Sequence, residues 1–232
     1  IFYPHCTVMH QKGRVIYMTT KPEDVKFIVT IGREFGSGGH EIGKRLAKEL
    51  GIAFYDTELL ELAVAKTGYH EDYIRSNDEK APDFAAGPLF SGMEYYQPSP
   101  YDKIQVEVRK IIEDIAENES AVIVGRAADY ILRDKTHVSV FLFAPMEDRI
   151  KRKMALLDEK TRSEITDSMM EKTIRQRDKQ RRRFYEYYTD MRWGARDTYD
   201  LLINTSRAGI EGSVKIIETF IKEGYDENIL PD

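Results

Sequence analysis

A glycine run with the sequence GREFGSGGH offers the clearest chemistry in this 232-residue chain. It follows a mostly apolar segment and precedes a helical pattern, whose free N–H groups and dipole favour an anion. Successive glycines also let the backbone approach an anion closely. A tight turn without a ligand explains one or two glycines, but it explains four within eight residues poorly. The pattern therefore predicts a phosphate-binding loop, whose nucleotide-binding residues we expect to be Gly32, Arg33, Gly36, Ser37, Gly38, Gly39, His40 and Glu41.

This loop lacks the lysine of the strict nucleoside triphosphate motif, G-x-x-x-x-G-K-[ST]. The register on GSGGH places Gly39 at the lysine position and His40 at the position of the hydroxyl that binds magnesium. Arg33 stands at the mouth of the loop, and we hypothesise that it supplies the missing charge. A solvated or carboxylate-paired Arg33 is the alternative.

A second ligand class also fits the glycine spacing. The pattern G-x-x-x-G-x-G resembles the dinucleotide turn of short-chain dehydrogenases, which need a tyrosine and a lysine at i, i+4 further along the chain. The one such pair is Tyr17 and Lys21, and it precedes the loop. An oxidoreductase is therefore disfavoured.

Five buried-strand patterns must position these residues, and helical patterns separate them. The strand patterns span Lys26–Gly32, Gly51–Thr57, Ala121–Val124, His137–Pro145 and Tyr199–Ser206. This alternation predicts an α/β fold with a doubly wound parallel sheet of about five strands and helices on both faces. Ligands of such sheets bind at the carboxyl ends of the strands, where the glycine run, Asp56 and Arg126 all lie.

The composition is that of an ordinary globular protein, with 41% hydrophobic and 32% charged residues. The net charge of −5 gives no reason to expect nucleic acid or a membrane as a partner. The single cysteine, Cys6, cannot form an internal disulfide, which favours a cytoplasmic location. Residue 1 is not methionine, and we expect translation to begin at Met9 or Met18, inside an N-terminal extension of residues 1–25.

Six blocks of the sequence occur in an order that is typical of one family. They are VTIGREFGSGG, FYDTELL, VIVGRAADYIL, FLFAPMEDRIKRK, DKQRRRFYEYYT and YDLLINTS. In these blocks, from about Lys26 to Phe220, the chain resembles the cytidylate kinase-like family. The resemblance implies that residues 26–232 form a P-loop nucleoside monophosphate kinase domain with an acceptor-binding insertion and an arginine-bearing lid. It also implies transfer of the γ-phosphate of ATP to a pyrimidine monophosphate with Mg²⁺.

The matching blocks also imply roles for individual residues. Donor phosphates would bind at Gly36 to Glu41, and the acceptor at Asp56, Arg126 and Asp129. Planar guanidinium groups suit phosphoryl transfer because they bind phosphate oxygens two at a time. The candidate catalytic residues are Arg33, Arg149, Arg152, Arg177, Asp178 and Arg181. A solvated helix with ordinary ion pairs is the alternative for the last three.

Two further segments are expected to serve the site. The irregular stretch 81–101 is rich in Pro, Gly and aromatic residues, and its rings would cover an acceptor base or pack on the surface. The charged span 157–170 is the candidate lid, which would exclude water from the reaction. Aromatic crowding from Phe184 to Trp193 is typical of packing or of a subunit contact, which leaves homo-oligomerisation open.

The sequence departs from the cytidylate kinase pattern at the acceptor. DTE lacks the glycine of the acceptor segment, LLEL stands where an arginine would grip the acceptor phosphate, and Ala127 replaces an aspartate. Two functions therefore stay open: a nucleoside monophosphate kinase with a cytidylate-like acceptor, and a non-catalytic nucleotide-binding module that has lost the lysine. Both predict nucleotide substrates or ligands, but only the first predicts magnesium-dependent turnover.

Overall fold

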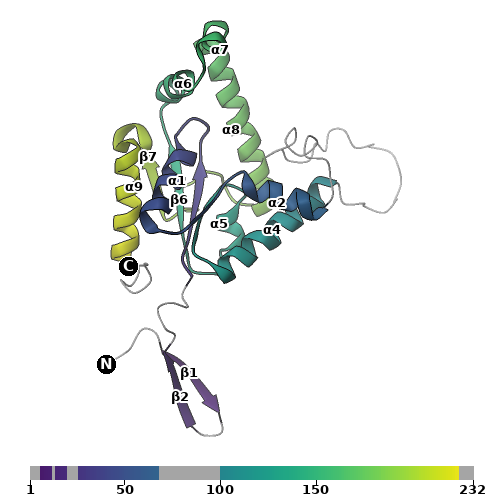
Figure 1. Cartoon of the computed structure of the whole chain (residues 1–232), viewed down its shortest axis with the longest axis vertical. Coiled ribbons are helices and arrows are strands. Elements are labelled where there is room, and N and C mark those ends of the chain that lie inside the picture. The colour runs from purple at the N-terminus through teal and green to yellow at the C-terminus, as the bar shows by residue number, and fades with distance from the viewer. Residues whose placement is uncertain (1–5, 12–13, 20–25, 68–99, 225–232) are drawn as a thin grey trace, which may run out of the picture.

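The computed structural model describes residues 6–11, 14–19, 26–67 and 100–224. Its core is a five-stranded sheet in the order β4-β5-β3-β6-β7, with every neighbouring pair parallel (Figure 1). The strands are β3 (Ile28–Arg33), β4 (Ala53–Tyr55), β5 (Ala121–Val124), β6 (His137–Phe143) and β7 (Leu201–Asn204). Each of the five predicted strand segments contains one of them or overlaps it. The predicted doubly wound parallel sheet is confirmed.

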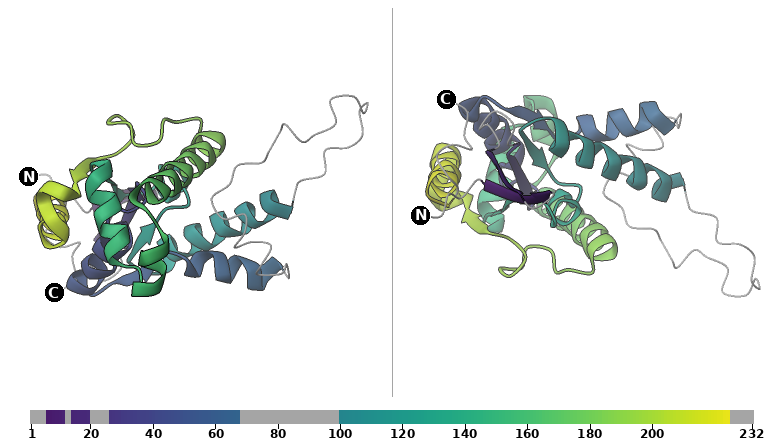
Figure 2. Two further views of the ribbon diagram at one scale, coloured as in Figure 1. Left: turned by 90° about the horizontal axis from the view of Figure 1, so that it is seen from above. Right: turned by 90° about the horizontal axis from the view of Figure 1, so that it is seen from below.

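Helices cover both faces of this sheet, as predicted (Figure 2). The helices α1 (Gly39–Leu50) and α9 (Thr205–Gly224) pack against each other and against one face. The opposite face carries α2 (Glu58–Thr67), α4 (Pro100–Asn118) and α5 (Ala128–Ile131). The end of α8 (Asp167–Thr189) completes that layer with an aromatic cluster. Two shorter helices, α6 (Met146–Ala155) and α7 (Glu159–Glu164), precede α8.

The strand β3 lies at the centre of the sheet, and its side chains are buried on both faces. Ile28 belongs to the apolar cluster under α2 and α4, whereas Val29 and Ile31 belong to the cluster under α1 and α9. All three side chains are at most 2% exposed. Later strands in the chain lie on both sides of β3, with β5 on one side and β6 on the other. The carboxyl end of β3 is therefore a topological switch point, where open sheets of this type bind ligands.

The helix after this strand has a clear sequence basis. Ile42, Leu46 and Leu50 share one face of α1 and are buried against the sheet. Gly51 ends the helix in the left-handed conformation, with φ of 64°. The amphipathic pattern thus fixes the direction of α1, and its first turn follows directly from the glycine run.

The predicted lid span 157–170 contains α7, the junctions on either side of it and the first turn of α8. The Asp158 side chain caps α7 by accepting a hydrogen bond from the Thr161 N–H. The Thr166 side chain caps α8 in the same way with the Met169 N–H. Figure 1 shows α6, α7 and the start of α8 standing above the carboxyl edge of the sheet.

The sequence prediction differs from the structure in two segments. Most of the predicted irregular insertion 81–101 lies outside the described residues. For its last two residues the prediction of an irregular loop is wrong, because α4 already begins at Pro100. The predicted extension 1–25 contains an antiparallel hairpin, β1 (Cys6–Gln11) and β2 (Arg14–Thr19), which we did not predict. Among the described helices, none is long and apolar enough to cross a membrane. A cytoplasmic location stays a prediction.

Candidate active site

The glycine run forms a tight loop between β3 and α1. Ser37 closes it, because both its backbone N–H and its hydroxyl donate to the Glu34 carbonyl, at 3.3 and 2.9 Å. Gly36 and Gly38 adopt φ of 87° and 92°, a region that residues with a Cβ rarely occupy. No side chain caps the start of α1. The first N–H groups of that helix therefore lack the usual side-chain acceptor, as at helix starts that bind anions.

Side chains from two other helices press on this loop. A Cβ added at Gly36 would lie 3.1 Å from Arg149 Cβ and 3.2 Å from Lys153 Cγ, both on α6. One added at Gly38 would lie 2.8 Å from Ile210 Cδ1 of α9 and 3.2 Å from Arg152 Cζ. The glycines are thus required by close packing as well as by backbone conformation.

An ion pair behind the loop fixes its shape. The Asp178 carboxylate of α8 accepts a hydrogen bond from the Phe35 N–H at 2.7 Å and pairs with Arg149 Nη1 at 2.5 Å. Arg149 is buried and also lies 3.6 Å from Glu34 Oε2. Burial raises the pKa of Glu34, although the N–H of Ala144 and the Arg149 charge oppose that rise. The four groups form a clamp, made of Glu34, Phe35, Arg149 and Asp178, that ties α6 and α8 to the loop.

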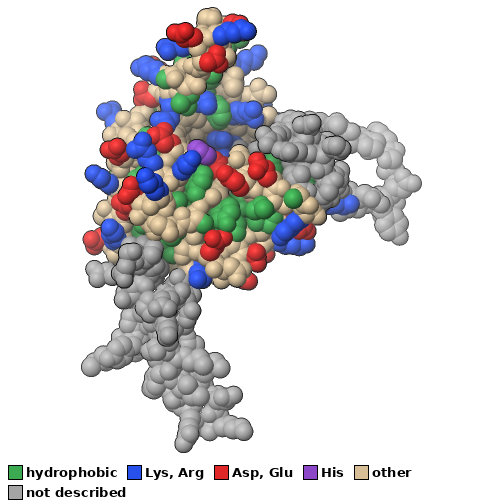
Figure 3. Space-filling model, in the orientation of Figure 1, with side chains coloured by type: hydrophobic (Ala, Val, Ile, Leu, Met, Phe, Trp, Pro, Cys, Tyr) green, Lys and Arg blue, Asp and Glu red, His purple; other side chains and the backbone are tan. Residues whose placement is uncertain are grey.

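The loop opens into a cleft of about 610 Å³. Its described lining consists of Arg33, Glu34, Phe35, Gly36, Gly38, Gly39, His40, Glu41, Lys44, Arg45, Lys48, Asp56, Arg152, Lys153, Leu156 and Arg181. In Figure 3, Lys and Arg side chains gather around the hollow above the sheet. The cleft thus combines backbone donors with cations from α1, α6 and α8, which is an environment for a polyanion.

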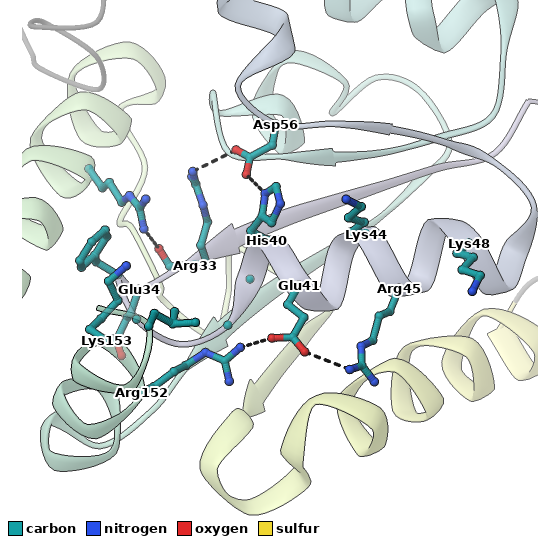
Figure 4. Close-up of a pocket in the computed structure, with 16 residues that line it drawn as sticks. Arg33, Glu34, His40, Glu41, Lys44, Arg45, Lys48, Asp56, Arg152 and Lys153 are labelled. Atoms are coloured by element: carbon teal, nitrogen blue, oxygen red, sulfur yellow. Dashed lines mark hydrogen bonds and ion pairs between the residues drawn. The ribbon is translucent and has the colours of Figure 1, made fainter. Parts of the chain in front are cut away.

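Carboxylates neutralise part of this charge at the rim of the cleft (Figure 4). Glu41 pairs with Arg152 through one oxygen and with Arg45 through the other, the latter at 3.1 Å. Asp56 Oδ2 lies 2.7 Å from Nδ1 of His40, whose side chain is 60% exposed. Asp56 Oδ1 lies 3.5 Å from Nη2 of Arg33. Opposite charges at such distances hold the rim together without an anion in the cleft.

The stem of Arg33 lies against the loop, but its guanidinium lies at the end of β5. The aliphatic part of its side chain lies against Gly39, where an added Cβ would come within 2.8 Å of Arg33 Cγ. Its guanidinium lies over Gly125 at the end of β5, where an added Cβ would come within 2.1 Å of Nη1. Arg181 Nη1 donates to the Arg33 carbonyl at 3.2 Å. The Arg33 charge is therefore placed between β3 and β5, not at the lysine position of the loop.

A smaller cavity of about 20 Å³ lies beyond Arg33. Arg126, from the turn after β5, and Asp129, from α5, line it together with Arg33 and Arg181. Arg126 is 5% exposed and has φ of 60°, a strained conformation of the kind that is stored at functional sites. The Tyr185 hydroxyl donates to Asp129 at 2.5 Å. Burial raises the pKa of Asp129 above that of an ordinary carboxyl group, and it also raises the pKa of Tyr185.

A third cavity, of about 230 Å³, lies on the other side of the loop, between α6 and α9. Gly36 and Arg152 line both this cavity and the main cleft. Ser37 lines the third cavity, with Thr205 and Ser206 at the start of α9. The loop therefore separates two adjoining spaces.

The structure brings most of the predicted site residues together. Those that line the main cleft are Arg33, Gly36, Gly38, Gly39, His40, Glu41, Asp56, Arg152 and Arg181. The small cavity is lined by Gly32, Arg126 and Asp129, among others. Arg149 and Asp178 lie in the clamp, and Arg177 is exposed on α8, where its charge lowers the pKa of Lys153.

Sequence reasoning missed several lining residues. Lys153 directly follows Arg152 and lies in the same helical turn, which was a usable signal. Lys44 follows His40 by one turn, so its place on the same face of α1 was also predictable. Phe35 gave no such signal, because the direction of a loop side chain depends on its neighbours in space.

The fold is that of the P-loop kinases. A solved shikimate kinase from Bacteroides thetaiotaomicron shares the fold, with a TM-score of 0.52 at 17% identity over 84% of this chain and 98% of that one. An uncharacterized protein from Eubacterium ventriosum is more similar, with a TM-score of 0.62 and 27% identity over the same shares of the two chains.

The family follows from the sequence match. The model of the cytidylate kinase-like family matches residues 28–207, and the chain belongs to that family. A cytidylate kinase from Desulfurococcus amylolyticus is 30% identical over 187 residues, which cover 80% of this chain and 88% of that protein. One from Saccharolobus islandicus is 25% identical over 199 residues, with 84% and 90% covered. The predicted resemblance is confirmed.

The clamp predicts that Asp178→Asn is costly. Arg149 would keep only the more distant Glu34 as a charge partner, and removing one partner of a buried pair costs about 3–5 kcal/mol. We expect the free energy of unfolding, measured in urea, to fall by about 3 kcal/mol. Glu171→Gln breaks the exposed pair between Glu171 and Arg175 and should cost less than about 1 kcal/mol. Equal losses in the two variants would contradict the clamp.

The raised pKa of Asp129 predicts a pH dependence. Between the pKa of the unfolded and of the folded chain, the folded protein binds more protons, so this carboxyl makes stability fall as pH rises. The free energy of unfolding of the wild type, minus that of Asp129→Asn, should therefore decrease as pH rises from about 4. Asp134→Asn, at an exposed carboxyl, is the control. A difference that does not change with pH would show the prediction to be wrong.

Proposed function

We propose that this protein catalyses ATP-dependent phosphoryl transfer to a nucleoside monophosphate with a cytidylate-like acceptor. One observation carries the proposal: the glycine loop and the cations of α6 and α8 converge on a single cleft at the carboxyl end of β3. Phosphoryl transfer asks the protein for positioning and positive charge rather than covalent chemistry. Backbone N–H groups together with Arg152, Lys153 and Arg181 offer both. The names of the relatives support the cytidylate-like acceptor.

The donor would lie across the glycine loop. Its phosphates would bind N–H groups between Gly36 and Glu41, on the side of the main cleft, other than that of Ser37, which donates to the Glu34 carbonyl. Its nucleoside would enter the adjoining cavity between α6 and α9, which is about 230 Å³ in volume. Arg152 lines both spaces, so one guanidinium would reach the donor where base and phosphates meet. The loop thereby supplies orientation, since the two ends of the donor occupy different spaces.

The acceptor would approach from the side of β4 and β5. Asp56 and the guanidinium of Arg33 lie there, and Arg126 and Asp129 lie just beyond. Since Arg33 is held between β3 and β5, we assign its charge to the boundary between donor and acceptor. Arg181 donates to the Arg33 carbonyl and lines both cavities, so it would act at the same boundary.

Mg²⁺ suits this cleft without a preformed protein cage. The described part of the chain contains no cluster of three His, Cys, Asp or Glu side chains placed for a metal ion. Mg²⁺ usually binds one or two carboxylates together with substrate phosphates and water. Glu41 and Asp56, which line the cleft, would be its protein ligands. When bound, the ion would neutralise charge on the phosphates.

Arg149, Asp178 and Arg177 would act differently from the arginines in the cleft. Arg149 and Asp178 are held in the clamp and would position the loop. Arg177, exposed on α8, would add charge from the edge of the cleft. The span 157–170 would close over the donor and exclude water.

The non-catalytic alternative rests on a specific observation. The lysine position of the loop is Gly39, and the stem of Arg33 occupies the space beside it. A protein that kept the fold and the loop but lost phosphoryl transfer would still bind a nucleoside triphosphate. Turnover, rather than binding, separates the two functions.

The test is ADP release by the purified protein with ATP and Mg²⁺, against a panel of nucleoside monophosphates, nucleosides and no acceptor. We expect magnesium-dependent ADP release that requires an acceptor and is fastest with a pyrimidine monophosphate. ATP binding without turnover across the panel would favour the non-catalytic module. Failure to bind ATP would overturn the proposal.

Gly38→Ala should weaken donor binding while sparing the fold. Its φ of 92° and the contact with Ile210 leave no place for a methyl group, and such strain costs about 1–3 kcal/mol. If the loop shifts to relieve it, the dissociation constant for ATP should rise roughly tenfold or more. Gly51→Ala is a matched control, because Gly51 has φ of 64° but an added Cβ meets no atom within 4 Å. Equal ATP affinity in the two variants would speak against the loop as the donor site.

A further inference from the structure

A lysine from outside the glycine loop lies along it. Lys153 belongs to α6, and its Nζ lies 4.6 Å from the centroid of the Phe35 ring. Its Cγ would be 3.2 Å from a Cβ added at Gly36. The side chain therefore follows the outer surface of the loop, and it lines the main cleft (Figure 4). Stem and ammonium group are both fixed by contacts with the loop.

The loop itself has no room for a lysine at the usual position. Gly39 is buried, and a Cβ there would lie 2.8 Å from Cγ and 2.9 Å from Cβ of Arg33. The side chain of Arg33 is held in turn by Asp56 and by its position over Gly125. A lysine at position 39 would require all of these contacts to move. A cation that replaces this lysine at the donor phosphates would therefore have to come from another element.

Like charges surround Lys153. Burial lowers the pKa of its ammonium group, and the charges of Arg181, Arg152 and Arg177 lower it further. The loop contributes Glu34 to the same cleft, but Arg149 and the Ala144 N–H already share that carboxylate. Several cations that converge on one half-buried space repel one another, and an anion between them relieves that repulsion.

We infer that Lys153 is a donor-phosphate-binding residue that takes over, from α6, the role of the lysine that the loop lacks. This inference rests on the proposed function, since it assigns a residue to the same donor site. Two other lysines line the cleft, but Lys44 and Lys48 are exposed on successive turns of α1 and lie progressively further from the loop (Figure 4). Lys153 is the lysine whose stem contacts the loop glycine.

The experiment compares ATP affinity, by calorimetry, in the wild type and three variants. Lys153→Met removes the charge and keeps most of the stem, and it should raise the dissociation constant for ATP roughly 10- to 100-fold. Lys151→Met, at an exposed lysine of the same helix, should leave the affinity unchanged. Lys153→Arg keeps a cation and should retain most of the affinity. Urea unfolding of each variant shows whether the fold is intact.

A second readout tests the charge directly. Anion binding favours the protonated ammonium group, so ATP binding by the wild type should take up protons at alkaline pH, where the free Lys153 is partly neutral. Calorimetry in two buffers of different ionisation enthalpy measures this uptake. Lys153→Arg should abolish it, because arginine stays charged. This readout stays decisive if Lys153→Met fails to fold.

The outcomes separate this inference from the proposed function. Wild-type ATP binding that is matched by Lys153→Met, or proton uptake that persists in Lys153→Arg, would overturn the role of Lys153 and leave the nucleotide site standing. A wild type that binds no ATP would overturn the proposed function and this inference together. Selective loss in Lys153→Met, with Lys151→Met unaffected and proton uptake absent in Lys153→Arg, would establish the inference.

Discussion

The carboxylate of Asp178 holds together the parts on which this site depends. It reaches the backbone of the loop through the Phe35 N–H and the helix α6 through Arg149. Because Asp178 belongs to α8, one side chain connects the loop to both α6 and α8. Arg149 is buried, so its charge requires this partner. The positions of Arg152 and Lys153, on the same helix as Arg149, follow from that connection.

The loop glycines are a consequence of the same packing. Arg149 and Lys153 lie close to Gly36, while Arg152 and Ile210 lie close to Gly38. Gly36 and Gly38 therefore meet two requirements at once: a positive φ, and no Cβ where a neighbouring side chain lies.

The sequence was sufficient to predict the sheet and the place of the site. The five strand patterns, the helix after the loop and the carboxyl-end position of Asp56 and Arg126 all follow from local periodicity and from the rules of parallel sheets. The pair of Arg149 with Asp178 could not be predicted in this way, since its members are 29 residues apart and meet only when α6 packs against α8. The direction of Arg33 was equally hidden, because it depends on the space that Gly39 and Gly125 leave free. By contrast, the hairpin β1–β2 was missed although both strands are rich in strand-forming residues.

The displacement of charge from the loop to α6 has a mechanical consequence. A lysine within the loop is fixed relative to the donor phosphates, whereas a cation on α6 moves with that helix, which directly precedes the span 157–170. If Lys153 binds the donor, then donor affinity is linked to the position of α6 and of the span 157–170 that follows it. The reason is that phosphates that attract Lys153 also draw α6 toward the loop. Linkage of this kind is reciprocal, so closure of the lid would tighten donor binding by the same factor by which the donor favours closure. In such a site the ion pair of Asp178 with Arg149 limits how far α6 can move away from the loop. It thereby keeps the charge of Lys153 close to the position where the loop lacks its lysine.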